Sequence, residues 1–175
     1  MSRSARHFIL QFLLAVGVAL SAQSGVNPDG NRDGKRILFV CTGNFYRSRF
    51  AEAIFNQKAH DAHSSWVAIS RGLQLDPTQH GISAYALEEL KKRGVPRALW
   101  AGAPKALTRA DLEQSDYVVL MDEAEHRPML EKQFPSHEGP KIHYWKIGEA
   151  DTMSPSQACQ LMTKDAEDLL RTLPR

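Results

Sequence analysis

The chain has 175 residues, of which 42% are hydrophobic and 24% charged, and these proportions fit one globular domain with its own core, plus an extension. The formal net charge is only +2, and the lysines and arginines are dispersed, which excludes the basic stripe of a nucleic-acid-binding protein. The two cysteines, Cys41 and Cys159, are too few for a disulfide framework, and the seven histidines show no metal-ligand spacing. We therefore expect no metal, no other cofactor and no nucleic acid partner.

The first 34 residues differ in kind from the rest. Arg3 and Arg6 precede an apolar run over residues 8–20, and small residues follow, which is the layout of a secretory signal peptide over residues 1–24. The run, of about 13 residues, is too short for an ordinary membrane span, so we expect no stable one. Residues 25–34 are typical of a flexible linker. The alternative is an upstream start codon assigned in error.

Residues 35–175 are predicted to form one α/β domain. Apolar strand-like runs alternate with segments of helical periodicity, which is typical of a parallel sheet with helices on both faces. The expected strands are residues 36–41, 66–70, 116–121 and 141–146, and the expected helices are residues 48–60, 82–94, 123–133 and 154–172.

Local signals mark several helix ends within this domain. Gly94, with Pro96 two residues later, is predicted to close the second long helix. Residues 108–111 have the form of a capping box, with aspartate in the usual place of glutamate. Ser154 and Pro155 are predicted to be the N-cap and the first residue of the last helix. Cys159 lies within this helix and is expected to be a packing residue.

The first expected strand runs into a loop in which five residues separate a cysteine from an arginine. Five residues allow the backbone to curl into a ring whose N–H groups bind an anion. Gly43 and Asn44 are residue types that tolerate the positive φ such a ring requires. The loop reads Cys41, Thr42, Gly43, Asn44, Phe45, Tyr46, Arg47, Ser48.

The same loop carries the groups needed to attack a bound phosphate. A helix that begins near Arg47 or Ser48 directs the positive end of its dipole at the loop, which favours a bound anion and a thiolate alike. The planar guanidinium of Arg47 matches two phosphate oxygens, and Ser48 can donate its hydroxyl to the sulfur. Cys41 is therefore the predicted nucleophile.

This segment resembles the signature of the low-molecular-weight protein tyrosine phosphatases, an apolar strand followed by Cys-x-Gly-Asn-x-Cys-Arg-Ser-Pro-x-Ala-Glu. The likeness continues through residues 67–72 and 117–122 and covers roughly residues 35–173. It implies a three-layer fold with a four-stranded parallel sheet of order 2-1-3-4. It also implies a phosphotyrosine protein or small phosphate ester as substrate, and a cytoplasmic location, with export through residues 1–24 as the alternative.

Two positions in the loop depart from that signature. Tyr46 replaces a second cysteine that, in many members, traps the oxidised nucleophile as a reversible disulfide. Arg49 replaces a proline at the start of the helix, where fixed φ is helpful but dispensable. We expect Arg49 either to aid anion capture or to be a solvated surface residue. Phe45 and Tyr46 are expected either to line the mouth of the pocket or to fill space in the core.

The general acid of the family is an aspartate in an Asp-Pro-aromatic loop after the fourth strand, and this chain has no such tripeptide. Glu149 and Asp151 both lie in the loop before the last helix, at the edge of the sheet where open α/β folds bind ligands. Resemblance to relatives with a Trp-x3-Asp segment favours Glu149, which follows Trp145 at that spacing. Resemblance to relatives of the shorter aspartate type favours Asp151, which we slightly prefer.

We therefore predict a cysteine-dependent phosphomonoester hydrolase, most simply a protein tyrosine phosphatase. Cys41 attacks phosphorus and forms a cysteinyl-phosphate, while the loop amides and Arg47 hold the phosphoryl oxygens. Glu149 or Asp151 protonates the leaving group and then activates water.

Three alternatives remain. The missing Asp-Pro is compatible with a non-catalytic module that binds phosphate or phosphopeptides. An arsenate reductase needs two further cysteines a few residues apart, whereas the chain offers only Cys159. A phosphocarrier domain is disfavoured because Arg47 and Ser48 complete the hydrolase signature. The oligomeric state is not predicted.

Overall fold

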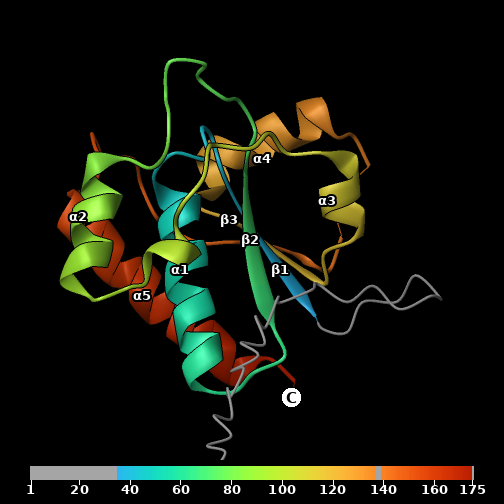
Figure 1. Ribbon diagram of the computed structural model, residues 1–175. Coiled ribbons are helices and arrows are strands. Elements are labelled where there is room, and N and C mark those ends of the chain that lie inside the picture. Colours follow the sequence, from blue (N-terminus) through green and yellow to red (C-terminus); the bar gives the residue numbers. More distant parts are fainter. Residues whose placement is uncertain (1–34, 137–138, 175) are drawn as a thin grey trace, which may run out of the picture.

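The computed structural model describes residues 35–136 and 139–174, so the expected signal peptide and linker lie outside the described residues. Four parallel strands form one sheet in the order β2-β1-β3-β4, as predicted, with helices on both faces (Figure 1). The elements are β1 (Arg36–Cys41), α1 (Arg47–Asp61), β2 (Val67–Gly72), α2 (Ala84–Lys92), the 3-10 helix η1 (Arg97–Leu99), α3 (Arg109–Glu113), β3 (Tyr117–Leu120), α4 (Glu123–Gln133), β4 (Ile142–Tyr144) and α5 (Pro155–Thr172).

The central strand β1 is buried on both sides, and its alternating side chains join two hydrophobic cores. Ile37 and Phe39 pack with residues of α1, α2 and α5. Leu38 and Val40 point the other way and pack with residues of α3 and α4. The period-2 alternation of a strand thus distributes one continuous apolar run between two helical layers.

The predicted helix ends are largely confirmed, but two short helices, η1 and α3, are absent from the predicted elements. Gly94 has φ of +67°, and the N–H of Val95 donates to the carbonyl of Leu90 at 3.0 Å, which closes α2. Thr108 and Asp111 form a reciprocal capping box at the start of α3. That five-residue helix was not predicted because so few residues show no helical periodicity.

The carboxyl end of β2 supports the loop that follows β1. Gly72 pairs with Cys41, and a Cβ at position 72 would lie only 2.8 Å from the backbone nitrogen of Asn44. The N–H groups of Leu73 and Gln74 then donate to the carbonyls of Cys41 and Thr42 at 3.0 and 2.7 Å. The close approach of these two segments therefore requires glycine at position 72.

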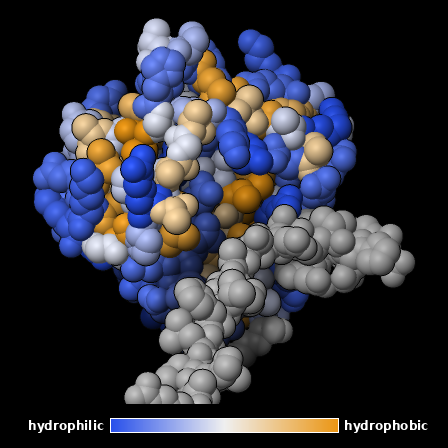
Figure 2. Space-filling view, viewed as in Figure 1, coloured by the Kyte–Doolittle hydropathy of each residue, from blue (hydrophilic) through white to orange (hydrophobic). Residues whose placement is uncertain are grey.

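Within the described part of the chain, no helix is both long and apolar enough to cross a membrane. On the face shown in Figure 2, hydrophobic residues form separate patches between hydrophilic ones.

Arg49 is not the solvated surface residue that we considered as one of its two roles. Its side chain is buried, and its guanidinium donates to the carbonyl oxygens of Trp100, Gly102 and Gly81 at 2.7, 2.9 and 3.0 Å. The first turn of α1 is thereby joined to two segments that are distant in sequence. Arg49 is therefore a structural residue that satisfies backbone acceptors with charge-assisted hydrogen bonds.

We predict that Arg49→Met lowers the free energy of unfolding by about 2–4 kcal/mol, because three carbonyl groups lose a charged donor while the apolar stem is retained. Urea unfolding of the purified variant measures this change. The matched control is Arg97→Met, since Arg97 is exposed. Equal stability of the two variants would contradict the structural role of Arg49.

Candidate active site

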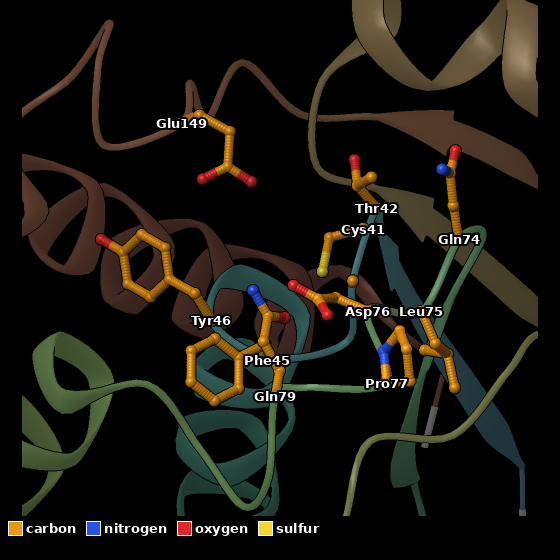
Figure 3. A pocket seen from close by; sticks show the side chains of 11 residues that line it. Cys41, Thr42, Phe45, Tyr46, Gln74, Leu75, Asp76, Pro77, Gln79 and Glu149 are labelled. Carbon is orange, nitrogen blue, oxygen red and sulfur yellow. The ribbon is translucent and has the colours of Figure 1, made fainter.

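A cavity of about 640 Å³ opens at the carboxyl edge of the sheet, where the loops after β1, β2 and β4 meet. In Figure 3, Phe45 and Tyr46 lie on one side of the sulfur of Cys41, and Leu75 and Pro77 lie on the other. Six predicted site residues line this cavity together with residues of the β2–α2 loop. The lining residues are Cys41, Thr42, Gly43, Phe45, Tyr46, Gln74, Leu75, Asp76, Pro77, Gln79 and Glu149.

The loop between β1 and α1 presents backbone donors without internal partners. Among the backbone hydrogen bonds found outside the described helices and strands, none uses an N–H of residues 42–46 as the donor. Tyr46 is the N-cap of α1, and its side chain accepts no hydrogen bond from the helix. The first N–H groups of α1 therefore have no capping side chain as an acceptor. Consecutive free N–H groups beside a helix N-terminus are suited to bind an anion.

Asn44 holds the loop in its ring shape. Its φ is +49°, as predicted for this residue, whereas Gly43 is not among the residues with positive φ. The buried side chain donates to the hydroxyl oxygens of Ser48 and Ser70 at 3.0 and 2.8 Å, and its carbonyl oxygen accepts from the N–H of Lys105 at 2.8 Å. Three hydrogen bonds thus stabilise a conformation that L-residues rarely adopt.

Cys41 is buried, and its sulfur lies 3.0 Å from the hydroxyl oxygen of Ser48. Because that oxygen also accepts from the amide of Asn44, the hydroxyl hydrogen is free to point at the sulfur. The predicted contact between Ser48 and Cys41 is therefore present, in a form that stabilises a thiolate.

Arg47 is fully buried, is not among the residues that line the cavity, and uses four of the five N–H bonds of a guanidinium. Nη1 donates to Glu125 Oε2 at 2.7 Å and to the carbonyl of Ile147 at 3.1 Å. Nη2 donates to Glu125 Oε1 at 2.9 Å and to a carboxylate oxygen of Glu149. Nε, which is also buried, has no acceptor among the described residues.

The carboxylates around Arg47 maintain its charge despite burial. Burial by itself lowers the pKa of the guanidinium, but its hydrogen bonds to Glu125 and the nearby charges of Cys41 and Glu149 raise the pKa overall. Burial likewise opposes the charge on Glu125, yet its bonds to Arg47 and Thr42 lower its pKa to about 2. Both partners are therefore ionised at neutral pH.

Neither Glu125 nor His126 was predicted as a site residue. His126 is fully buried and hydrogen-bonded to Asp122. Both residues lie in the first turn of α4, directly after β3. Their position at the carboxyl edge of the sheet is the signal that could have identified them.

The two candidate acids lie in different environments. Glu149 lines the cavity and forms an ion pair with Arg47. Asp151 is exposed and is not among the residues that line the cavity. The carbonyl of Glu149 accepts the N–H groups of Thr152 and Met153, a turn that fixes the backbone of this loop. Of these two candidates, therefore, only Glu149 lines the cavity that contains Cys41.

Tyr46 combines the two roles that were considered for it, because it lines the cavity and is only 7% exposed. Its ring packs edge-on against Tyr85, and its hydroxyl donates to the carbonyl of Pro155 at 3.2 Å. Cys159 packs on α5 as predicted, 3.9 Å from that hydroxyl, and burial raises its pKa to about 11. Cys159 is therefore an unreactive core thiol.

The described residues hold no cluster of three or more histidine, cysteine or carboxylate side chains suited to a metal ion.

Comparison with known proteins places the chain in a family. Residues 36–146 match the model of the "Low molecular weight phosphotyrosine protein phosphatase" family. The phosphatase of that name from Pongo abelii is 33% identical over 105 residues, which are 56% of this chain and 61% of the relative. The chain thus matches less than two thirds of the length of that relative.

Solved structures show the same architecture. A low molecular weight protein tyrosine phosphatase from T. tengcongensis superimposes with a TM-score of 0.70 and 29% identity, over 80% of this chain and 100% of the other. An arginine phosphatase from Geobacillus stearothermophilus gives a TM-score of 0.62 at 23% identity, over 81% of this chain and 99% of the other, a likeness of fold alone. The family resemblance seen in the sequence is confirmed.

We predict that Asn44→Ala lowers the free energy of unfolding by about 2–4 kcal/mol, because it removes three hydrogen bonds and leaves alanine with positive φ. His63→Ala is the matched control, since His63 is exposed and has φ of +50°. Urea unfolding of the control isolates the backbone contribution. An Asn44→Ala loss no larger than that of the control would refute the stabilising role of the network.

Proposed function

The chain belongs to the low molecular weight phosphotyrosine protein phosphatase family, and we propose that it is a cysteine-dependent phosphatase whose leading substrate is protein phosphotyrosine. The observation that carries this proposal is the position of Cys41 in the cavity, beside unpartnered loop N–H groups and within electrostatic range of the buried Arg47. A nucleophile, an anion receptor and a carboxylate meet there, which is the minimum set for phosphoryl transfer through a covalent intermediate.

The first step transfers the phosphoryl group to sulfur. The Cys41 thiolate attacks phosphorus in line, and the bond from phosphorus to the ester oxygen breaks as the sulfur–phosphorus bond forms. The loop N–H groups of residues 42–46 hold the equatorial oxygens as charge moves onto them. Ser48 lies 3.0 Å from the sulfur and stabilises the thiolate before attack and after release.

Arg47 receives the phosphate through the edge that Glu125 leaves open. Glu125 occupies the edge made by Nη1 and Nη2, whereas the edge made by Nε and the second N–H of Nη2 carries only Glu149. A phosphate that accepts from this second edge displaces Glu149 from Nη2. The bidentate geometry that results is the one that suits an arginine and a phosphate.

We assign the general acid to Glu149, which reverses the preference for Asp151 drawn from the sequence. Released from Arg47 by the incoming phosphate, Glu149 lies at the cavity wall within reach of the leaving oxygen. Once free of Arg47, its carboxylate takes up a proton from solvent and donates that proton to the leaving oxygen in the first step. In the second step it takes a proton from the attacking water, while the sulfur–phosphorus bond breaks and the Cys41 thiolate is regenerated. Asp151, exposed outside the cavity, has no comparable access.

A second candidate substrate class follows from the charge of the cavity wall. Asp76 and Glu149 are its charged residues apart from the nucleophile, and both are acidic. Hydrogen bonds from Thr78 lower the pKa of Asp76, which keeps it ionised. A cationic leaving group such as the guanidinium of phosphoarginine fits such walls, so peptides with phosphotyrosine and with phosphoarginine are to be compared directly.

We predict that Cys41→Ser abolishes hydrolysis of p-nitrophenyl phosphate but keeps the affinity for inorganic phosphate, because the anion receptor is backbone and Arg47. Steady-state kinetics and calorimetric titration measure the two properties. Residual activity above about a tenth of the wild type would refute the nucleophile assignment. An inactive wild-type protein that still binds phosphate would favour the non-catalytic module.

We predict that Glu149→Gln lowers kcat for phosphotyrosine about 10²–10⁴-fold, whereas Asp151→Asn changes it less than about threefold. The loss is expected to be smaller for p-nitrophenyl phosphate, since a better leaving group needs less protonation. Each variant removes one carboxylate, and the two positions lie only two residues apart, so each variant serves as the control for the other. The opposite ranking would return the acid role to Asp151.

A further inference from the structure

We propose that Glu125 is a positioning residue, which fixes the guanidinium of Arg47 so that its Nε–Nη2 edge faces the phosphate. The inference rests on the proposed function, because it concerns how the same site binds its phosphoryl group. Glu125 itself touches no reacting atom in the proposed mechanism and acts through Arg47.

The contacts of Arg47 define which edge is held and which is available. Both oxygens of Glu125 accept from Arg47, at 2.7 Å from Nη1 and 2.9 Å from Nη2, in a bidentate pair. The carbonyl of Ile147 takes the remaining N–H of Nη1. A planar group held along one edge has no rotational freedom left, so the orientation of its other edge is fixed.

The first turn of helix α4 leaves the carboxylate of Glu125 without the capping hydrogen bond that is usual at its position. Asp122 is the N-cap and accepts from the N–H of Glu125 at 2.9 Å, so Glu125 occupies N3. A glutamate at N3 ordinarily accepts from the backbone N–H of the N-cap. Here the Asp122 N–H lies 3.0 Å from Nδ1 of His126 instead, which leaves the carboxylate of Glu125 free to reach Arg47.

His126 and Thr42 hold Glu125 from the other side. Nδ1 of His126 lies 3.0 Å from the backbone nitrogen of Asp122 and 2.8 Å from its carbonyl oxygen, and Nε2 lies 3.3 Å from Thr42 Oγ1 and 3.4 Å from Glu125 Oε1. Burial lowers the pKa of His126, which favours a neutral ring. The hydroxyl of Thr42 donates to the same carboxylate oxygen of Glu125. Glu125 is therefore held by Thr42 and His126 as well as by Arg47.

The exposed fractions of the two carboxylate side chains agree with a fixed Glu125 and a displaceable Glu149. The Glu125 side chain is 31% exposed and holds Arg47 through two oxygens, whereas that of Glu149 is 44% exposed and uses one. The more exposed and singly bonded partner is the easier one to exchange for phosphate. Glu125 therefore remains in place while the substrate takes the position of Glu149.

The test measures the affinity of the full chain for inorganic phosphate by calorimetry, together with kcat for p-nitrophenyl phosphate. Glu125→Gln keeps the length but loses one acceptor, and we expect about tenfold weaker phosphate binding and a tenfold or larger loss of kcat. Glu125→Asp keeps the charge but shortens the arm, and we expect an intermediate loss. Glu123→Gln is the control, because Glu123 lies in the same helical turn and pairs with Arg127 on the surface.

Two outcomes would overturn the proposal. If Glu125 acts only by its charge, Glu125→Gln binds the phosphate dianion more tightly and Glu125→Asp equals the wild type. If its role is only structural, urea unfolding shows lower stability while phosphate affinity is unchanged. If Glu125→Gln does not fold, Glu125→Asp is sufficient for the test. An unchanged phosphate affinity of that variant refutes the positioning role of Glu125. A wild type that binds phosphate without turnover would refute the phosphatase assignment, yet the affinities would still test Glu125.

Discussion

The buried positive charge of Arg47 is the constraint on which the rest of the site depends. A guanidinium without solvent contact is costly unless it is paired and hydrogen-bonded. Its partners come from α4, from the backbone after β4 and from the loop before α5, while Arg47 itself begins α1. The parallel order of the strands brings these ends to one edge, so the fold and the anion receptor have the same geometric cause.

A second constraint is the backbone of the loop that precedes Arg47. Asn44 has positive φ, and Gly72 leaves room for the loop to lie against the end of β2. Both features cost conformational freedom, which the hydrogen bonds of Asn44 and the packing of β1 offset. The resulting loop presents its N–H groups before any ligand arrives. Such preorganised donors stabilise developing charge without reorganisation at the moment of reaction.

The sequence was sufficient for the features that depend on neighbouring residues. The four strands, the positive φ of Asn44 and the capping box of residues 108–111 follow from local patterns, and the structure agrees with each. Glu125 and Asp76 were missed because their roles depend on which loops the sheet brings together. Arg49 was misjudged for the same reason, since its three carbonyl partners lie 32 to 53 residues away in the chain.

The departures of this chain from the family signature are each accompanied by a new contact. Tyr46, at the place of a second cysteine, is anchored by Pro155 and packs on Tyr85. Arg49, at the place of a proline, joins α1 to two distant segments. Each of these two side chains therefore has its own partners outside the loop. The N–H groups on which the proposed anion binding depends belong to the backbone and not to these two side chains.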